Sequence, residues 1–83
     1  MKPLRIDKET QNAMVLAHLR TAPITPMEAL RNFGCFRLAA RVYDLRQYGH
    51  EILTLRVVNN HGNAYAEYHL LKLAPREAEH GHR

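Results

Sequence analysis

The chain lacks several features that particular classes of protein need. It has 83 residues, one cysteine and no tryptophan. A single cysteine excludes an internal disulfide, so we expect a reducing, cytoplasmic setting. No apolar run approaches the roughly 20 residues of a membrane-spanning helix, and the start of the chain lacks the apolar stretch of a signal peptide. The length allows one small domain, for which we expect no membrane contact.

The chain also lacks the residue spacings of familiar catalytic and metal sites. Its six histidines are scattered, with no paired cysteines and no HxxxH or HExxH motif. No glycine-rich phosphate loop is present, and no histidine or acid stands close to Cys35 in the sequence to activate its thiol. A lone cysteine between glycine and phenylalanine is most often a small buried apolar residue. We therefore predict a protein that is not an enzyme and uses no metal or cofactor.

Positive charge is present, and it is unevenly distributed. The net charge is +4, and residues 1–50 hold eight Lys and Arg against four acids, whereas residues 51–83 hold four of each sign. A basic surface favours a polyanion such as nucleic acid, although many small basic proteins bind none. Charge alone therefore does not identify the partner.

The first part of the chain is expected to be an arm followed by a helix. Residues 1–9 are polar and mixed in charge, which predicts a flexible N-terminal arm. From Thr10 to about Arg20 the apolar residues recur at three- and four-residue steps, which predicts the first helix. Pro23 then ends it, because a proline disfavours the helical conformation of the preceding residue.

The segment "ITPME" predicts the start of a second helix. Thr25 can cap the helix, Pro26 suits its first position, and Glu28 stands three residues after Thr25 as a capping box requires. Gly34 supplies a helix terminator about two turns later.

A third helix is expected over residues 36–48. The apolar side is predicted to consist of Cys35, Leu38, Ala39, Val42 and Leu45. The opposite side is predicted to consist of Arg37, Ala40, Asp44, Gln47 and Tyr48, with Arg41 at its margin. Arg46 lies nearer the apolar edge and is expected to be a partly buried structural residue.

After Gly49 the period of the apolar residues changes to two. Residues 50–58 and 64–73 are rich in β-branched and aromatic side chains, and "NNHGN" between them predicts a hairpin loop of about four residues. Asn60 and Gly62 are the candidates for positive φ. Residues 74–83 carry no periodic apolar residues and are predicted to form a disordered tail.

The segment "ITPMEALRNFGCFRLAARVYDLRQYGHEI" resembles the helix-turn-helix domains of small phage and prophage proteins. The similarity lies in the threonine, the alanine-leucine, the corner glycine, "LAAR", "DLR", and the final glycine and isoleucine. The second half is similar to the winged helix of biotin-operon repressors, where a leucine, a glycine and an isoleucine lead from the recognition helix into the wing. The resemblance implies an α+β fold, a winged helix-turn-helix with three helices followed by a two-stranded β-hairpin wing, over residues 10–73.

The resemblance also implies which residues touch DNA. Helix 36–48 would enter the major groove, where Arg37 can pair with guanine and Arg41 can meet a base or a phosphate. Ala40 leaves room for a thymine methyl, and Asp44 is expected to orient Arg41. The other expected contacts are with the DNA backbone or a minor-groove edge, from Gln47, Arg31, Asn32, Asn60 and His61.

The predicted function is a phage or prophage transcriptional regulator that binds double-stranded DNA. A homodimer, or several copies on one DNA, would supply specificity. One alternative is a phage-encoded winged-helix protein that binds and modulates a host protein complex instead of DNA, and another is a structural part of a DNA-processing assembly. The aromatic candidates for a protein interface are Phe36, Tyr43 and Tyr65, although each is expected to pack in the core or the hairpin. In a third interpretation the arginines form a solvated surface without a partner.

Overall fold

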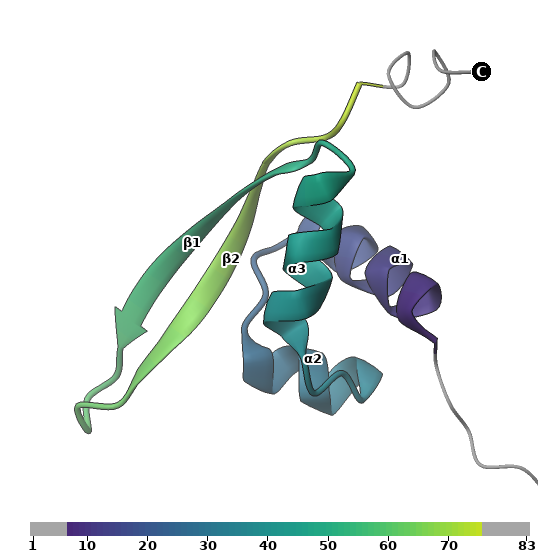
Figure 1. The fold of residues 1–83 in the computed structure, drawn as a ribbon. Helices are drawn as coiled ribbons and strands as arrows, with labels where there is room; N and C mark the ends of the chain where they lie inside the picture. Colours follow the sequence, from purple (N-terminus) through teal and green to yellow (C-terminus); the bar gives the residue numbers. More distant parts are fainter. Residues whose placement is uncertain (1–6, 76–83) are drawn as a thin grey trace, which may run out of the picture.

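The computed structural model describes residues 7–75, which fold into three helices followed by a β-hairpin (Figure 1). The helices gather against one end of the hairpin, and its tip projects away from them. The predicted α+β order of three helices and two strands is confirmed. The elements are α1 (Lys8–Leu19), α2 (Pro26–Phe33), α3 (Leu38–Gln47), β1 (Glu51–Val58) and β2 (Ala64–Lys72).

Helix α1 begins two residues before its predicted start. The Asp7 carboxylate caps it by accepting a hydrogen bond from the backbone N–H of Thr10 at 2.8 Å. Lys8 and Glu9 therefore belong to the helix and not to an arm. The rest of the predicted arm, residues 1–6, lies outside the described residues.

The Asp7 cap makes a pH-dependent contribution to stability. The backbone hydrogen bond from Thr10 lowers the pKa of Asp7 below its usual value. A carboxylate with a lowered pKa in the folded state stabilises the fold above its unfolded pKa, and this contribution is lost as the pH falls through the folded pKa. Asp7→Asn keeps a capping oxygen without the charge. We expect the difference in unfolding free energy between wild type and Asp7→Asn to shrink between pH 7 and a pH well below 3.8, the ordinary value. Urea denaturation at both pH values measures it, and an equal difference at both would contradict the expectation.

Helix α2 has the ends that its sequence predicts. The Thr25 hydroxyl accepts from the Glu28 backbone N–H at 3.2 Å, and the Glu28 carboxylate accepts from the Thr25 N–H at 3.0 Å. Gly34 ends the helix in the left-handed conformation, with φ of 66°, which glycine adopts without steric cost. The predicted capping box and glycine terminator are both confirmed.

Helix α3 begins at Leu38, two residues after its predicted start. Cys35 is turned into the core with 1% of its surface exposed, and its N–H donates to the Ala29 carbonyl at 3.1 Å. The chain must therefore leave the core again before the helix can begin, and it does so through Phe36 and Arg37. Residues 34–37 thus form the corner between the two helices.

The apolar stripe of α3 is confirmed in part. Leu38, Val42 and Leu45 are all buried, as predicted. Ala39, predicted on the apolar side, is exposed, and Ala40, predicted on the opposite side, is half-buried.

The two strands pair in antiparallel fashion and are joined by a loop over residues 59–63, one residue longer than predicted. The side-chain oxygen of Asn59 accepts from the backbone N–H groups of His61 at 2.8 Å and Asn63 at 3.0 Å, which organises the loop. Gly62 has φ of 86°, but no residue other than glycine has positive φ among the residues described. Asn60, a candidate for positive φ, therefore does not adopt it, and the loop is held by the hydrogen bonds of the Asn59 side chain.

One core joins the helices to the hairpin. Ile24, in the link between α1 and α2, forms a β-bridge with Tyr68 of β2. The Ile24 N–H donates to the Tyr68 carbonyl at 3.0 Å, and the Ile24 carbonyl accepts from the Tyr68 N–H at 2.9 Å. The other core side chains come from all three helices and both strands, and include Val15, Leu19, Ala29, Val42 and Ile52.

The packed part of the chain extends past the predicted domain end. Ala74 is buried, and its N–H donates to Nδ1 of His50, also buried, at 2.9 Å. The prediction that the disordered tail begins at Ala74 is therefore wrong for this residue, because it closes the end of the hairpin over His50. Residues 76–83 of that tail lie outside the described part of the chain.

Candidate nucleic-acid interface

The solvent-facing side of α3 is formed mainly by Ala39, Tyr43 and Gln47, which are all exposed. Gln47 was predicted on this side, whereas Ala39 was predicted to face the core and Tyr43 to be packed. The period of 3.6 residues places the buried stripe correctly. The period does not show which flank of α3 is covered by α1. In the structure α1 packs along the flank that carries Arg41 and Asp44, so the opposite flank is left exposed.

Arg41, predicted at the margin of the polar side, is half-buried and does not lie on the exposed face. Its side chain is 14% exposed and pairs with the Asp44 carboxylate at 3.1 Å. The same carboxylate oxygen accepts from the side-chain amide of Asn12 in α1 at 3.2 Å. The expectation that Asp44 orients Arg41 is confirmed. The pair therefore acts at the contact between α1 and α3.

Arg46 is a structural residue, as expected, although it is exposed. Its guanidinium donates to the Ile52 carbonyl at 2.6 and 3.1 Å and to the Thr54 hydroxyl at 2.8 Å. These bonds tie the end of α3 to β1 and so set the angle between the helix and the hairpin.

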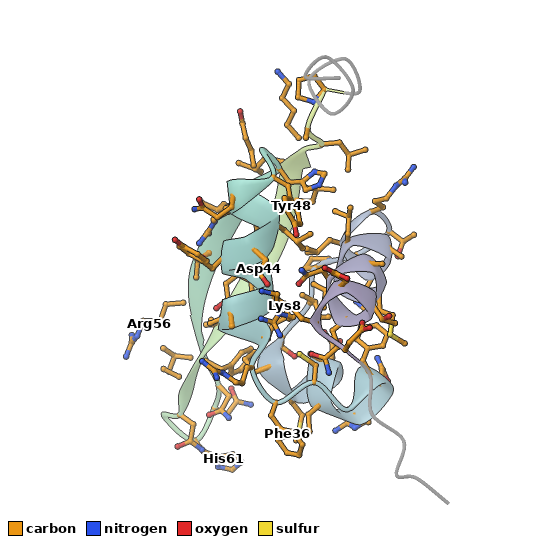
Figure 2. All side chains as sticks on the ribbon, turned by 45° about the vertical axis from the view of Figure 1, so that its right-hand side comes forward. Lys8, Phe36, Asp44, Tyr48, Arg56 and His61 are labelled. Atoms are coloured by element: carbon orange, nitrogen blue, oxygen red, sulfur yellow. The ribbon has the colours of Figure 1, made fainter. Side chains whose placement is uncertain are left out.

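The other predicted contacts all reach solvent, but from separate places. Arg37 is the N-cap of α3, Arg31 and Asn32 stand at the end of α2, and Asn60 and His61 lie in the hairpin loop. Phe36, beside Arg37, and His61 both lie at the same end of the molecule (Figure 2). The corner and the hairpin tip thus extend in the same direction, as the ribbon also shows.

Arg56 is a positively charged residue of β1 that was not among the predicted contacts, because only the loop of the hairpin was searched for them. It is exposed and stands opposite Ala66, on the strand face that carries Ile52 and Thr54. Figure 2 shows it projecting from β1 clear of the helices. The two-residue alternation of β1, followed beyond the end of the core, could have found it.

The three aromatic residues expected to pack are instead exposed. Phe36 is 84% exposed, Tyr43 59% and Tyr65 40%. Phe36 and Tyr43 lie at the start and on the open side of α3, so the surface around this helix combines aromatic and basic side chains. Within residues 7–75, no three His, Cys, Asp or Glu side chains gather to hold a metal ion. No helix in the same part of the chain has the length and apolarity needed to cross a membrane.

A family model described as a winged helix-turn-helix domain matches residues 10–73. The matched segment contains most of α1, all of the later elements, and therefore the exposed side of α3 and the hairpin loop. Comparison with curated proteins and with solved structures found no match.

Proposed function

The chain belongs to the winged helix-turn-helix domain family, and we propose that it binds double-stranded DNA with the exposed side of α3 in the major groove. Domains of this family typically bind DNA and are not enzymes. The observation that carries the proposal is the unused side of α3. Leu38, Val42 and Leu45, on the other side of the helix, are buried in the core, whereas Tyr43 and the residues beside it face solvent.

The side chains of this face suit a groove. Ala39 allows close approach of the helix backbone and contact with a thymine methyl, and Gln47 can donate to and accept from base edges or the backbone. Tyr43, between Ala39 and Gln47 on this face, has an aromatic ring and a hydroxyl group that could contact DNA. Arg41 is left out of this proposal, because its guanidinium is held by Asp44.

The hairpin and α2 would supply contacts with the DNA backbone beside the groove. Arg56 adds the positive charge that the loop residues Asn60 and His61 lack, and Arg31 and Asn32 are available at the end of α2. About four phosphate contacts would give a slope of log affinity against log salt of roughly −3.6. Two copies on one DNA would raise both affinity and specificity.

The finer role proposed is that of a transcriptional regulator of the phage or prophage type. Its support is the similarity of the segment from Ile24 to Ile52 to such helix-turn-helix proteins.

The proposal is tested by fluorescence anisotropy with random-sequence duplex DNA. We expect wild type to bind at 50 mM salt and to lose about 100-fold in affinity at about 200 mM. Tyr43→Ala/Gln47→Ala is expected to lose at least about tenfold at the lower salt while keeping its circular dichroism spectrum. The matched control is Leu53→Ala/Leu71→Ala, which truncates two exposed side chains on the hairpin face turned away from the helices.

The two negative outcomes have different meanings. Equal losses of DNA affinity in the double variant and in the control would contradict the proposal that α3 is part of the interface. Absence of wild-type binding at 50 mM salt would contradict DNA binding by the single domain and favour the alternative of a host or phage protein complex. The search for that partner would begin at the exposed apolar side chains on the outer face of the hairpin, Leu53, Leu55, Tyr65 and Leu71.

A further inference from the structure

A hollow lies between the start of α1 and the corner that leads into α3. Its volume is about 430 Å³, in the measure by which one water molecule needs ~10–15 Å³. Three cationic side chains and one carboxylate face it, so its net charge is positive. The lining residues are Asp7, Lys8, Gln11, Gly34, Phe36, Arg37 and Arg41.

The backbone adds to the positive potential in this hollow. Residues at the N-terminal ends of both α1, with 12 residues, and α3, with 10 residues, line it. The positive end of each helix dipole therefore lies near it. Arg37, the N-cap of α3, has no side-chain acceptor to offer the first N–H groups of the helix. An uncapped helix start of this kind accepts an anionic oxygen readily.

Arg41 brings to the hollow a charge that is only partly neutralised. Its partner Asp44 shares one carboxylate oxygen between Arg41 and Asn12. Nε of Arg41 is buried and has no acceptor within residues 7–75. The single carboxylate of the lining, Asp7, already accepts from the Thr10 N–H as the cap of α1. The cationic groups thus outweigh the acidic one.

The rim of the hollow indicates which phosphate fits. Phe36 is 84% exposed beside Arg37, and its ring stands at the corner where α3 begins (Figure 2). A free phosphate ion would leave this ring in water, whereas a nucleic-acid strand would cover it with a deoxyribose while placing a phosphate in the hollow. The rim therefore favours a phosphodiester of a DNA backbone.

We propose that this hollow binds one backbone phosphate beside the groove that α3 enters, with Lys8 and Arg37 as its charged ligands. The proposal rests on the proposed DNA binding and changes one expectation drawn from the sequence. Arg37 holds the backbone and does not read guanine, so its contact is independent of base sequence. The phosphate fixes the depth of the start of α3 in the groove.

The test compares two variants of α1 that each remove one positive charge. Lys8 lines the hollow, whereas Arg20 caps the opposite end of the helix, roughly 18 Å away. Lys8→Gln is expected to reduce the slope of log affinity against log salt by about 1, equally for AT-rich and GC-rich duplexes, and Arg20→Gln is expected to leave it unchanged. Arg37→Gln should behave as Lys8→Gln does. An effect of Arg37→Gln confined to GC-rich duplexes would overturn its assignment to the backbone.

A second measurement needs no DNA and keeps the two proposals separate. Inorganic phosphate is titrated against chloride at matched ionic strength, and the amide signals of residues 8, 11 and 34–41 are followed by NMR. A reduced slope in Lys8→Gln supports the phosphodiester site with or without shifts in phosphate. If the amide signals shift on addition of phosphate but the salt slope of Lys8→Gln equals that of wild type, the hollow is a free-phosphate site and the DNA assignment is overturned. If the salt slope of Lys8→Gln is unchanged and the amide signals do not shift, the phosphate site is overturned, but the proposal that wild type binds DNA is not. If wild type binds no DNA at all, the phosphodiester site fails with the proposed function, and the phosphate titration alone decides whether a free anion occupies the hollow.

Discussion

Ile24→Ala is expected to destabilise the domain by about 3 kcal/mol, within the range of about 2–5 kcal/mol found for such truncations. Ile24 has no exposed surface, and it lies where the link between α1 and α2 meets β2. Its backbone pair with Tyr68 survives the substitution, so the loss comes from the cavity left in the core. In a small domain whose whole stability is about 5–15 kcal/mol, this is a large fraction. The melting temperature should fall by roughly 10–25 °C.

Calorimetry or thermal circular dichroism measures this loss, and two further variants calibrate it. Ile24→Val removes one methylene group and should cost about 1 kcal/mol. Leu71→Ala removes a side chain that is 62% exposed and should cost less than about 0.5 kcal/mol. If Ile24→Ala cost no more than Leu71→Ala, the core would not pass through the link between the first two helices.

The features that could be predicted from the sequence are those set by neighbouring residues. The capping box of Thr25 and Glu28 forms within three residues, and Gly34 ends α2 through its own backbone conformation. The buried stripe of α3 follows from a period that one helix contains. Each of these depends on local chemistry, so no knowledge of the rest of the fold was needed.

The errors arise where a distant segment decides the outcome. Ala39 and Ala40 were placed on the wrong sides of α3, because the flank covered by α1 depends on a contact between residues 32 positions apart, Asn12 and Asp44. The late start of α3 depends on the burial of Cys35 against Ala29, for which a helical period carries no signal. Ala74 joins the core through His50, 24 positions earlier. Tertiary contacts of this kind override local pattern.

The same limit applies to the candidate site. The family resemblance directed attention to α3 and the hairpin, but the choice of residues depended on which side of each element faces solvent. The exposure of Tyr43 and Arg56 and the burial of most of the Arg41 side chain could not be predicted for this reason. The hollow beside Lys8 could not be predicted at all, because α1 and the corner meet only after folding.

Asp44→Ala is the second change with a large expected effect, a loss of about 2–3 kcal/mol in unfolding free energy. Removing one partner of a buried ion pair costs about 3–5 kcal/mol, because the other charge stays buried without compensation. Arg41 and Asp44 are 14% and 18% exposed, so water screens part of that cost. Asn12 also loses its acceptor, and a buried donor without a partner costs about 1–3 kcal/mol.

Two further variants separate the charge from the packing. In Arg41→Met/Asp44→Leu both charges are replaced by apolar groups of similar volume between α1 and α3. The double variant should recover the part of the loss that comes from the uncompensated charge, whereas Asn12 still lacks its acceptor. Asp44→Asn keeps an acceptor for Asn12 but leaves Arg41 uncompensated. It should lower stability, and it should also strengthen binding to random duplex DNA at low salt, because it adds one net positive charge beside the hollow. Urea denaturation and anisotropy on the same preparations test both directions. A stability loss below about 0.5 kcal/mol in Asp44→Ala would show that the pair is a solvated surface contact and not a part of the join between the two helices.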